Sequence, residues 1–247
     1  MEQVKLTRRS FVAGATAAGA LAALSLTGCG GGSSEKKDDG AKSDDGAKGG
    51  TLTGACAYSS TNVNPIGNSS ALMLAATWHV FEGLYDLDLH TYKTYNALAA
   101  DKPTKISDTE YEVALRDGAK FSDGNEVTAD DVVNAINQNM ADATYGAFLE
   151  FIKSVEAKDA KTVSIKLKYA FEALLETRLS VVKVFPKSLS EDELKTNPIG
   201  SGPWMYKSIN GDDGGAIEFE PNPNYNGPKP ASADNMHWDV LLDDTSR

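Results

Sequence analysis

Hydrophobic and polar positions follow two different periods along residues 51–247. Alternation with a period of two predicts strands, whereas apolar residues spaced three or four apart predict helices. The segments with a strand pattern or a short apolar run are 51–58, 84–89, 111–115, 162–167, 181–185, 204–209, 216–220 and 236–242. The segments with a helical pattern are 71–81, 129–140 and 171–179. Many strands and few long helices predict an α+β or α/β fold, of which we favour α/β, a mixed sheet with flanking helices.

One helix start and two turns have recognisable side-chain patterns. Thr128 and Asp131 have the spacing of a capping box, in which each side chain bonds the backbone N–H of the other. Asp130 and Asp131 resemble paired catalytic carboxylates, but neighbours on a helix do not face each other, so we expect structural roles at the positive helix end. Residues 121–124 and 222–226 are predicted turns, because they combine Asn or Asp side chains with permissive backbone positions.

The first 28 residues predict a secretory signal peptide. Lys5, Arg8 and Arg9 form a cationic start. Residues 11–26 form an apolar stretch that is too short and too rich in Ala and Gly for a membrane-spanning helix. The sequence TRRSFV around the arginine pair matches the twin-arginine export pattern. Residues 1–28 are therefore expected to direct export.

A lipid anchor is predicted at Cys29. Residues 26–29 read LTGC and resemble the bacterial lipobox, which implies cleavage before Cys29 and attachment of acyl chains to it. Two or more buried chains anchor a protein stably in a membrane. The alternative is an ordinary signal peptide with a chance cysteine. Residues 30–50 contain no aromatic or branched aliphatic residue, so 29–50 is predicted to be the lipidated cysteine and a flexible tether.

The cysteine count and the net charge argue against a disulfide-stabilised domain and a nucleic-acid-binding protein. With Cys29 modified by lipid, Cys56 has no partner for a disulfide, so the globular part, 51–247, needs a core that is stable unaided. Cys56 itself is predicted to be a small buried hydrophobe. The formal net charge of −11 argues against nucleic acid as a partner and against electrostatic docking on anionic lipid.

Four stretches of the chain, taken in order, have the motifs of one known family. Residues 115–137 read LRDGAKFSDGNEVTADDVVNAIN, a strand ending in L-R-x-G, then F-x-D-G and a Thr-capped helix. Residues 96–103 (NALAADKP), 197–209 (NPIGSGPWMYKSI) and 221–247 (beginning PNPNYNGPKP) resemble the neighbouring family segments. Together they resemble the extracellular solute-binding protein family 5, which includes the oligopeptide, dipeptide and nickel-binding proteins of ABC importers. The departures from the family pattern are Ser201 for Thr, Trp204 for Tyr and Asn226 for Trp.

The resemblance implies a solute-binding protein and not an enzyme. By it, residues 51–247 form the first lobe of a periplasmic-binding-protein-like fold. The implied partners are a peptide or other small-molecule ligand, the permease subunits of an ABC transporter, and the membrane through the lipid anchor. The implied location is the extracytoplasmic face of the cell membrane, and no cofactor is expected. Peptides are the commonest cargo in the family, with nickel complexes and sugars as alternatives.

The resemblance also implies a second lobe, which this sequence does not contain. Closure of two lobes on a ligand is a hinge motion that a single lobe cannot perform. We therefore expect the 247-residue form to fold only partly or to bind very weakly. A fragment of a longer chain, a frameshifted gene product and a repurposed half are all compatible with the sequence.

Two loops supply the predicted ligand contacts. Residues 59–62 follow the first strand, and ligands of open α/β sheets collect beyond the carboxyl ends of strands. The turn at 201–204 offers backbone donors, a hydroxyl and an aromatic surface, and the resemblance implies that both regions help to line the cleft. Trp78 and Tyr85 are weaker candidates, which we expect in the core. The predicted contact residues are Ser59, Ser60, Thr61, Asn62, Ser201, Gly202 and Trp204.

Two other classes of function are weighed against this one. In a metal-dependent enzyme, His79 and Glu82, three apart on a helix, would share an ion, but a surface or core polar contact is the stronger interpretation, so no metal is expected. The sequence has no Gly-rich phosphate loop and no Cys-x-x-Cys motif. A structural or adhesive surface lipoprotein would have the same export features, and the motifs within 96–247 argue against it.

Overall fold

Two four-stranded sheets and a hairpin organise the part of the chain that the computed structural model describes, residues 49–59, 62–67 and 70–243. These residues belong to one unit, Gly46–Arg247. The predicted signal peptide, Cys29, the tether up to residue 48, Ser60 and Thr61 lie outside the described residues. Among the helices within the described ranges, none is both long and apolar enough to cross a membrane.

The first sheet joins strands from the beginning and the end of the described chain. Its order is β1-β10-β9-β8, with β1 parallel to β10 and the other neighbours antiparallel. The bounds are β1 Thr51–Cys56, β8 Trp204–Ile209, β9 Ala216–Pro221 and β10 Asn235–Val240. Cys56, predicted to be buried, is half-buried and packs against the core. A mixed sheet with flanking helices is the α/β arrangement that the sequence predicts.

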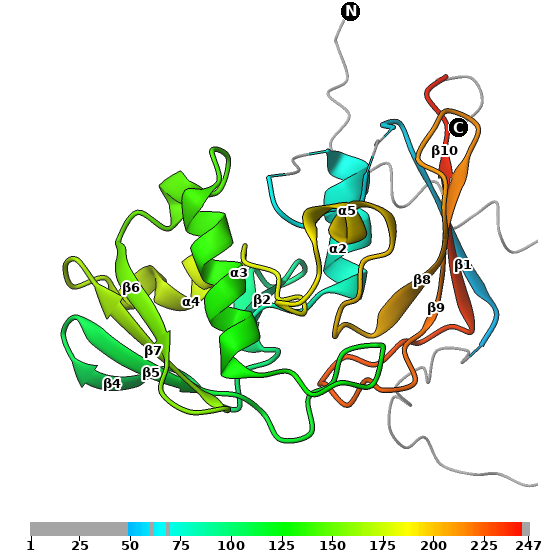
Figure 1. The fold of residues 1–247 in the computed structure, drawn as a ribbon. Coiled ribbons are helices and arrows are strands. Elements are labelled where there is room, and N and C mark those ends of the chain that lie inside the picture. Colours follow the sequence, from blue (N-terminus) through cyan, green and yellow to red (C-terminus); the bar gives the residue numbers. More distant parts are fainter. Residues whose placement is uncertain (1–48, 60–61, 68–69, 244–247) are drawn as a thin grey trace, which may run out of the picture. The chain divides into compact units, whose positions relative to one another are not determined.

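The second sheet is antiparallel throughout, with the order β4-β5-β7-β6. Tyr111 and Val113 of β5 pair with Ile165 and Val163 of β7, and all four side chains are buried on one face, as a period of two predicts. Helix α3 (Ala129–Ala141) packs on β6 and β7 (Figure 1). The bounds are β4 Thr104–Ser107, β5 Glu110–Ala114, β6 Ile152–Ala157 and β7 Thr162–Leu167.

Side-chain caps fix where α3 begins. The Thr128 side chain accepts a hydrogen bond from the backbone N–H of Asp131, and Asp131 Oδ2 accepts one from Thr128 N at 2.9 Å, so the predicted capping box is confirmed. Lys187 Nζ pairs with Asp130 at 2.6 Å, and Lys187 N donates to Asp131 Oδ1 at 2.9 Å. Both acidic residues therefore have the structural roles that the sequence predicts.

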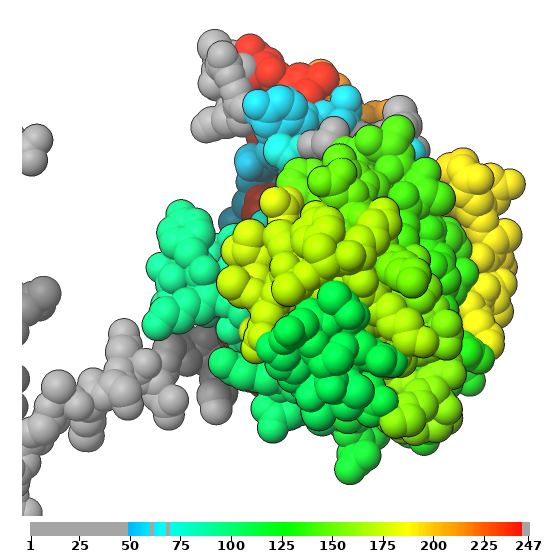
Figure 2. Space-filling view, turned by 90° about the vertical axis from the view of Figure 1, so that its left-hand side faces the viewer, coloured from blue at the N-terminus to red at the C-terminus, as the bar shows by residue number. Residues whose placement is uncertain are grey.

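A helix and a hairpin stand next to the two sheets. Helix α2 (Ala71–Val80) contacts β8, and strands β2 (Tyr85–Asp88) and β3 (Lys93–Asn96) form the hairpin. Both hairpin strands contact α4 (Leu175–Leu179), and Figure 2 shows the yellow-green segment around α4 beside the teal hairpin. The remaining helices are η1 Gly146–Phe148, η2 Glu172–Leu174 and α5 Glu191–Thr196.

Two predicted elements differ from the structure. Residues 181–185 are largely buried but form no strand. Val184 N donates to Glu82 O at 2.9 Å, which is an isolated contact and not a ladder. An apolar run reports burial rather than hydrogen-bond partners, which explains the wrong assignment. Residues 171–179, predicted as one helix, form the short η2 turn followed by the five-residue α4.

Glycines let the segment before β8 pass close to the end of α2. A Cβ atom at Gly202 would lie 2.6 Å from the carbonyl oxygen of His79, and one at Gly200 would overlap the carbonyl group of Val80. Gly202 N donates to Val80 O at 2.8 Å. This close approach holds the first residue of β8, Trp204, beside α2.

Candidate functional site

A groove runs along the partly exposed side of α2, beside the β2–β3 hairpin. Its volume is about 590 Å³, within the range of about 300–1,000 Å³ that is typical of ligand pockets. The groove continues into a side pocket of about 270 Å³, which Leu74, Trp78, Asp86, Leu87 and Tyr95 also line. The other residues of the side pocket are Tyr145, Ser180, Val181 and Lys183. The two cavities are therefore direct neighbours that share five lining residues.

All three tryptophans of the sequence line the groove. Trp78 lies on α2 with 42% of its surface exposed, Trp204 begins β8, and Trp238 lies on β10. Gly54 is the neighbour of Trp238 in the β1–β10 ladder, and a Cβ atom there would lie 2.9 Å from the indole ring. Glycine at this position therefore lets the ring lie over β1. Together with Tyr95, these side chains give the groove aromatic walls.

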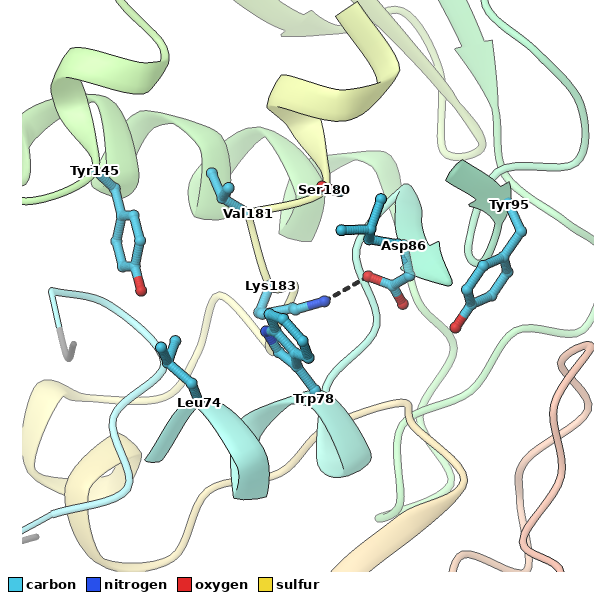
Figure 3. A pocket seen from close by; sticks show the side chains of 9 residues that line it. Leu74, Trp78, Asp86, Tyr95, Tyr145, Ser180, Val181 and Lys183 are labelled. Carbon is cyan, nitrogen blue, oxygen red and sulfur yellow. Dashed lines mark hydrogen bonds and ion pairs between the residues drawn. The ribbon is translucent and has the colours of Figure 1, made fainter. Parts of the chain in front are cut away.

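Two buried ion pairs form the floor of the groove. Arg116 Nη2 donates to Glu82 Oε2 at 2.7 Å, and the two side chains are 14% and 4% exposed. Lys183 pairs with Asp86, as the dashed line in Figure 3 shows. Asp86 Oδ1 also accepts a hydrogen bond from Gly83 N at 3.2 Å. Because breaking a buried pair leaves a charge without a partner, the two pairs hold the floor in place.

Burial raises the pKa of the Glu82 carboxyl group to about 7. Loss of water is the largest cause, and the charge of Asp86 acts in the same direction. The charge of Arg116 and its hydrogen bond oppose the rise, as does the nearby Ser201 hydroxyl. Burial also lowers the pKa of the His79 imidazole, which lines the groove. Both shifts disfavour the charged form, as expected where protein atoms replace water.

A third ion pair lies at the rim of the groove. Lys229 Nζ is 2.6 Å from Asp88 Oδ2 and 4.2 Å from the centroid of the Tyr95 ring. Asp88 Oδ1 accepts hydrogen bonds from the backbone N–H groups of His90 and Thr91, both at 3.0 Å, which holds the hairpin turn. The bond from Lys229, followed by that from Thr91, holds the pKa of the Asp88 carboxyl group well below its usual range. The pair is 49% and 26% exposed, so the rim faces water.

Comparison with known proteins assigns the chain to a family. The model of the bacterial extracellular solute-binding proteins, family 5, middle region, matches residues 93–247. The chain belongs to this family. The resemblance inferred from the sequence motifs is therefore confirmed, and with it the class of fold.

The chain spans less than half the length of the family 5 relatives to which it was compared. The oligopeptide-binding protein AppA of Bacillus subtilis is 34% identical over 128 residues, which are 47% of this chain and 23% of AppA. The glutathione-binding protein GsiB of Shigella boydii is 26% identical over 194 residues, which are 76% of this chain and 37% of GsiB. The structure of Bacillus subtilis AppA with a nonapeptide superposes with a TM-score of 0.69 at 26% identity, covering 81% of this chain and 41% of AppA.

The predicted ligand contacts that the structure describes differ in where they lie relative to the groove. Trp204 lines the groove. Ser201 and Gly202 are buried and are not lining residues, although the Ser201 hydroxyl lies close enough to the Glu82 carboxyl group of the floor to influence its pKa. Ser59 is exposed and Asn62 is half-buried, and neither lines the groove or the side pocket. Ligand contact by these residues stays a prediction.

The expectation of a core position is wrong for Trp78 and confirmed for Tyr85. Tyr85 is fully buried, whereas Trp78 is 42% exposed and lines both cavities. Because α2 is apolar on its core side (Leu72, Met73) and on its groove side (Leu74, Trp78), periodicity does not separate the two sides.

Other lining residues have weaker sequence signals. Asp86, Tyr95, Lys183, Tyr225 and Lys229 were not predicted as ligand contacts, although Tyr225 and Lys229 lie within the family segment 221–247. For Lys183 a signal exists, because a single lysine within the apolar run VVKVF predicts a buried cation with an acidic partner. No comparable pattern marks Asp86 or Tyr95.

His79 and Glu82, the pair considered for a metal ion, make other contacts in the structure. Glu82 is ion-paired with Arg116, while the neighbouring ring of His79 lies 6.4 Å, centroid to centroid, from that of Trp238. Within the described ranges, no group of three or more His, Cys, Asp or Glu side chains is placed to hold a metal ion.

Proposed function

We propose that residues 51–247 are the ligand-contacting lobe of a lipid-anchored substrate-binding protein. It captures peptides or similar small solutes outside the membrane and delivers them to the permease of an ABC importer. Membership of family 5 supports the solute-binding role. The relatives AppA and GsiB are named for binding oligopeptides and glutathione, which supports a peptide-class ligand.

The aromatic groove is the observation that carries this proposal. Trp78 and Trp238 offer rigid apolar surfaces for the side chains and backbone of a peptide, and Trp204, 5% exposed, lines the groove with a small part of its ring. The two acids of the floor have the buried partners Arg116 and Lys183, while the rim offers polar groups to water and ligand. A mainly apolar cavity with a few oriented polar groups is the usual form of a small-molecule site.

Tryptophan fluorescence tests this role directly, because the chain has no tryptophan outside the groove. We expect titration of the full chain with a nonapeptide, a tripeptide and glutathione to change the emission in a saturable way, at the low affinity expected of a single lobe. Titration calorimetry must give the same dissociation constant as the fluorescence titration. If no peptide produces saturation up to millimolar concentration by either method, solute capture by this chain is refuted.

A matched pair of variants locates the binding. Tyr95→Ala removes an aromatic wall of the groove, and we expect at least a tenfold loss of peptide affinity, equivalent to about 1.4 kcal/mol. Tyr169→Ala removes a tyrosine that is 49% exposed and lines neither cavity, so its affinity should equal that of the parent chain. Equal losses in both variants would place the ligand elsewhere.

Anchoring at Cys29 is a separate part of the proposal and has its own test. In cells fed a labelled fatty acid, the parent chain should carry label and sediment with membranes, while Cys29→Ser should lose both properties. Cys56→Ser is the matched control, since the thiol of Cys56 is free and has no place in the lipobox. Label that persists in Cys29→Ser would refute the anchor.

A further inference from the structure

The side pocket has walls from separate parts of the chain. Figure 3 shows Leu74 and Trp78 rising from α2 on one side, with Val181 and Tyr145 on the opposite side and Tyr95 of β3 at one end. Its volume is about 270 Å³. A dry protein cavity of about 150 Å³ accommodates benzene. The side pocket therefore has room for one aromatic ring and its attachment to a backbone, but not for a second ring.

Both charged side chains that line the side pocket within the described structure are already paired. Lys183 and Asp86 form an ion pair, and their side chains are 6% and 10% exposed. Lys183 Nζ lies 6.0 Å from the centroid of the Trp78 ring, on the side of its π face. Burial raises the pKa of the hydroxyl groups of Tyr95 and Tyr145, so both stay neutral near pH 7. The pocket therefore has no net charge to offer a ligand.

A charged ligand group gains little in such a pocket. An ammonium group would lose its water and meet Lys183, while a carboxylate would meet Asp86, and neither finds an unpaired counter-charge. An uncharged ring loses little hydration and contacts the aromatic faces of Trp78 and Tyr95. The chemistry of the walls thus distinguishes side chains by charge first and by shape second.

We propose that the side pocket is a specificity subsite that takes one uncharged aromatic side chain, the size of phenylalanine or tyrosine, from the captured solute. Trp78 and Tyr95 contact the faces of the ring, and Leu74 and Val181 close the pocket around its edge. The Lys183–Asp86 pair excludes charged side chains. This inference rests on the proposed function, because it assumes that the groove is the solute site.

Three blocked amino acids test the subsite without fixing the register of a longer peptide. The probes are the N-acetyl amides of phenylalanine, lysine and glutamate, titrated into the full chain with tryptophan emission as the readout. The phenylalanine probe should bind at least tenfold more tightly than either charged probe, since each unpaired charge carries an uncompensated loss of hydration. Equal affinities of the three probes would overturn the proposal.

A charge introduced at the mouth of the pocket should reverse the preference. Leu74→Glu places an unpaired carboxylate on α2 beside the pocket, so the lysine probe should gain at least tenfold and the phenylalanine probe should lose at least tenfold. Leu174→Glu is the matched control, because Leu174 is 44% exposed and lines neither cavity. Its probe affinities should equal those of the parent chain, and circular dichroism should show that both variants fold.

The results separate this inference from the function on which it rests. If peptides bind but phenylalanine and lysine probes bind equally, the subsite is refuted and the solute-binding role stands. If the phenylalanine probe binds selectively but no peptide saturates, the peptide role is refuted and the aromatic preference of the pocket stands. If Leu74→Glu does not fold, the comparison of the three probes on the parent chain still decides the question.

Discussion

The floor and the rim of the groove each contain an acid paired with a base, in different surroundings. In the floor, Glu82 and Arg116 are 4% and 14% exposed, and Arg116 also donates to the backbone oxygen of Ala97 at 2.8 Å. At the rim, Asp88 and Lys229 are 26% and 49% exposed. Removing one partner in the floor leaves a buried charge, whereas water replaces a partner at the rim. The floor therefore determines whether the groove forms, and the rim determines what approaches it.

The largest effect is expected from breaking the floor pair. Arg116→Met should lower the free energy of unfolding by about 1–3 kcal/mol at pH 8, because Glu82 loses its partner and must take up a proton to stay buried. Urea titration measures the change. The double variant Glu82→Gln/Arg116→Met removes both charges and should recover a large part of the loss. A loss below about 1 kcal/mol in Arg116→Met would mean that the pair behaves like a surface pair.

A pH dependence should distinguish the floor from the rim. The folded-state pKa of Glu82 is about 7, above its ordinary value of 4.5, so folding favours the protonated carboxyl group. Its contribution to stability is therefore fully present below pH 4.5 and is lost as the pH rises through 7, by up to about 3 kcal/mol. Glu82→Gln has no such titration. The stability of the parent chain relative to Glu82→Gln should fall across this window, and a constant difference would contradict the raised pKa.

A substitution in the wall of the groove should change ligand affinity more than it changes the free energy of unfolding. Trp78 is 42% exposed, so Trp78→Ala should change the free energy of unfolding by about 1 kcal/mol or less. Because the ring lines both cavities, we expect at least a tenfold loss of peptide affinity by calorimetry. A destabilisation as large as that of Arg116→Met would show that Trp78 is part of the core instead.

The smallest effect is expected at the rim. Lys229→Gln breaks the pair with Asp88 but leaves the bonds from His90 and Thr91 that hold the hairpin turn. Its melting temperature should stay close to that of the parent chain, because water and salt compensate for an exposed pair. Differential scanning calorimetry at low and high salt checks this. A large drop in melting temperature would remove the distinction between floor and rim.

Local patterns in the sequence were sufficient for much of the fold. The capping box of Thr128 and Asp131 and the alternation of residues 162–167 depend on contacts within or between adjacent segments, and both are present. Strands β3 (KTYN) and β4 (TKIS) were missed because they are mostly polar and lie in a hairpin or at a sheet edge. Strand β6 (IKSVEA) was missed because its two buried residues, Ile152 and Val155, lie three apart and do not alternate. Residues 181–185 were misassigned because burial alone does not define a strand.

The groove was harder to predict than the fold, because its contacts join residues that lie far apart in the sequence. The Asp88–Lys229 bond joins residues 141 positions apart, and the Lys183–Asp86 bond joins residues 97 positions apart. No local pattern specifies such pairs. The turn at 201–204 was identified from its motif, but the sequence did not reveal that Ser201 lies beneath the groove while Trp204 lines it.

The side-chain N–H signals of the three tryptophans test most directly whether the groove is the solute site. A two-dimensional nitrogen–proton NMR spectrum of the labelled full chain should contain one indole signal each for Trp78, Trp204 and Trp238. On addition of a nonapeptide, we expect all three to shift with one common dissociation constant, while the backbone amide of Ile106, on exposed β4, stays in place. Indole signals that do not move while amides of the second sheet do would contradict the assignment of the groove.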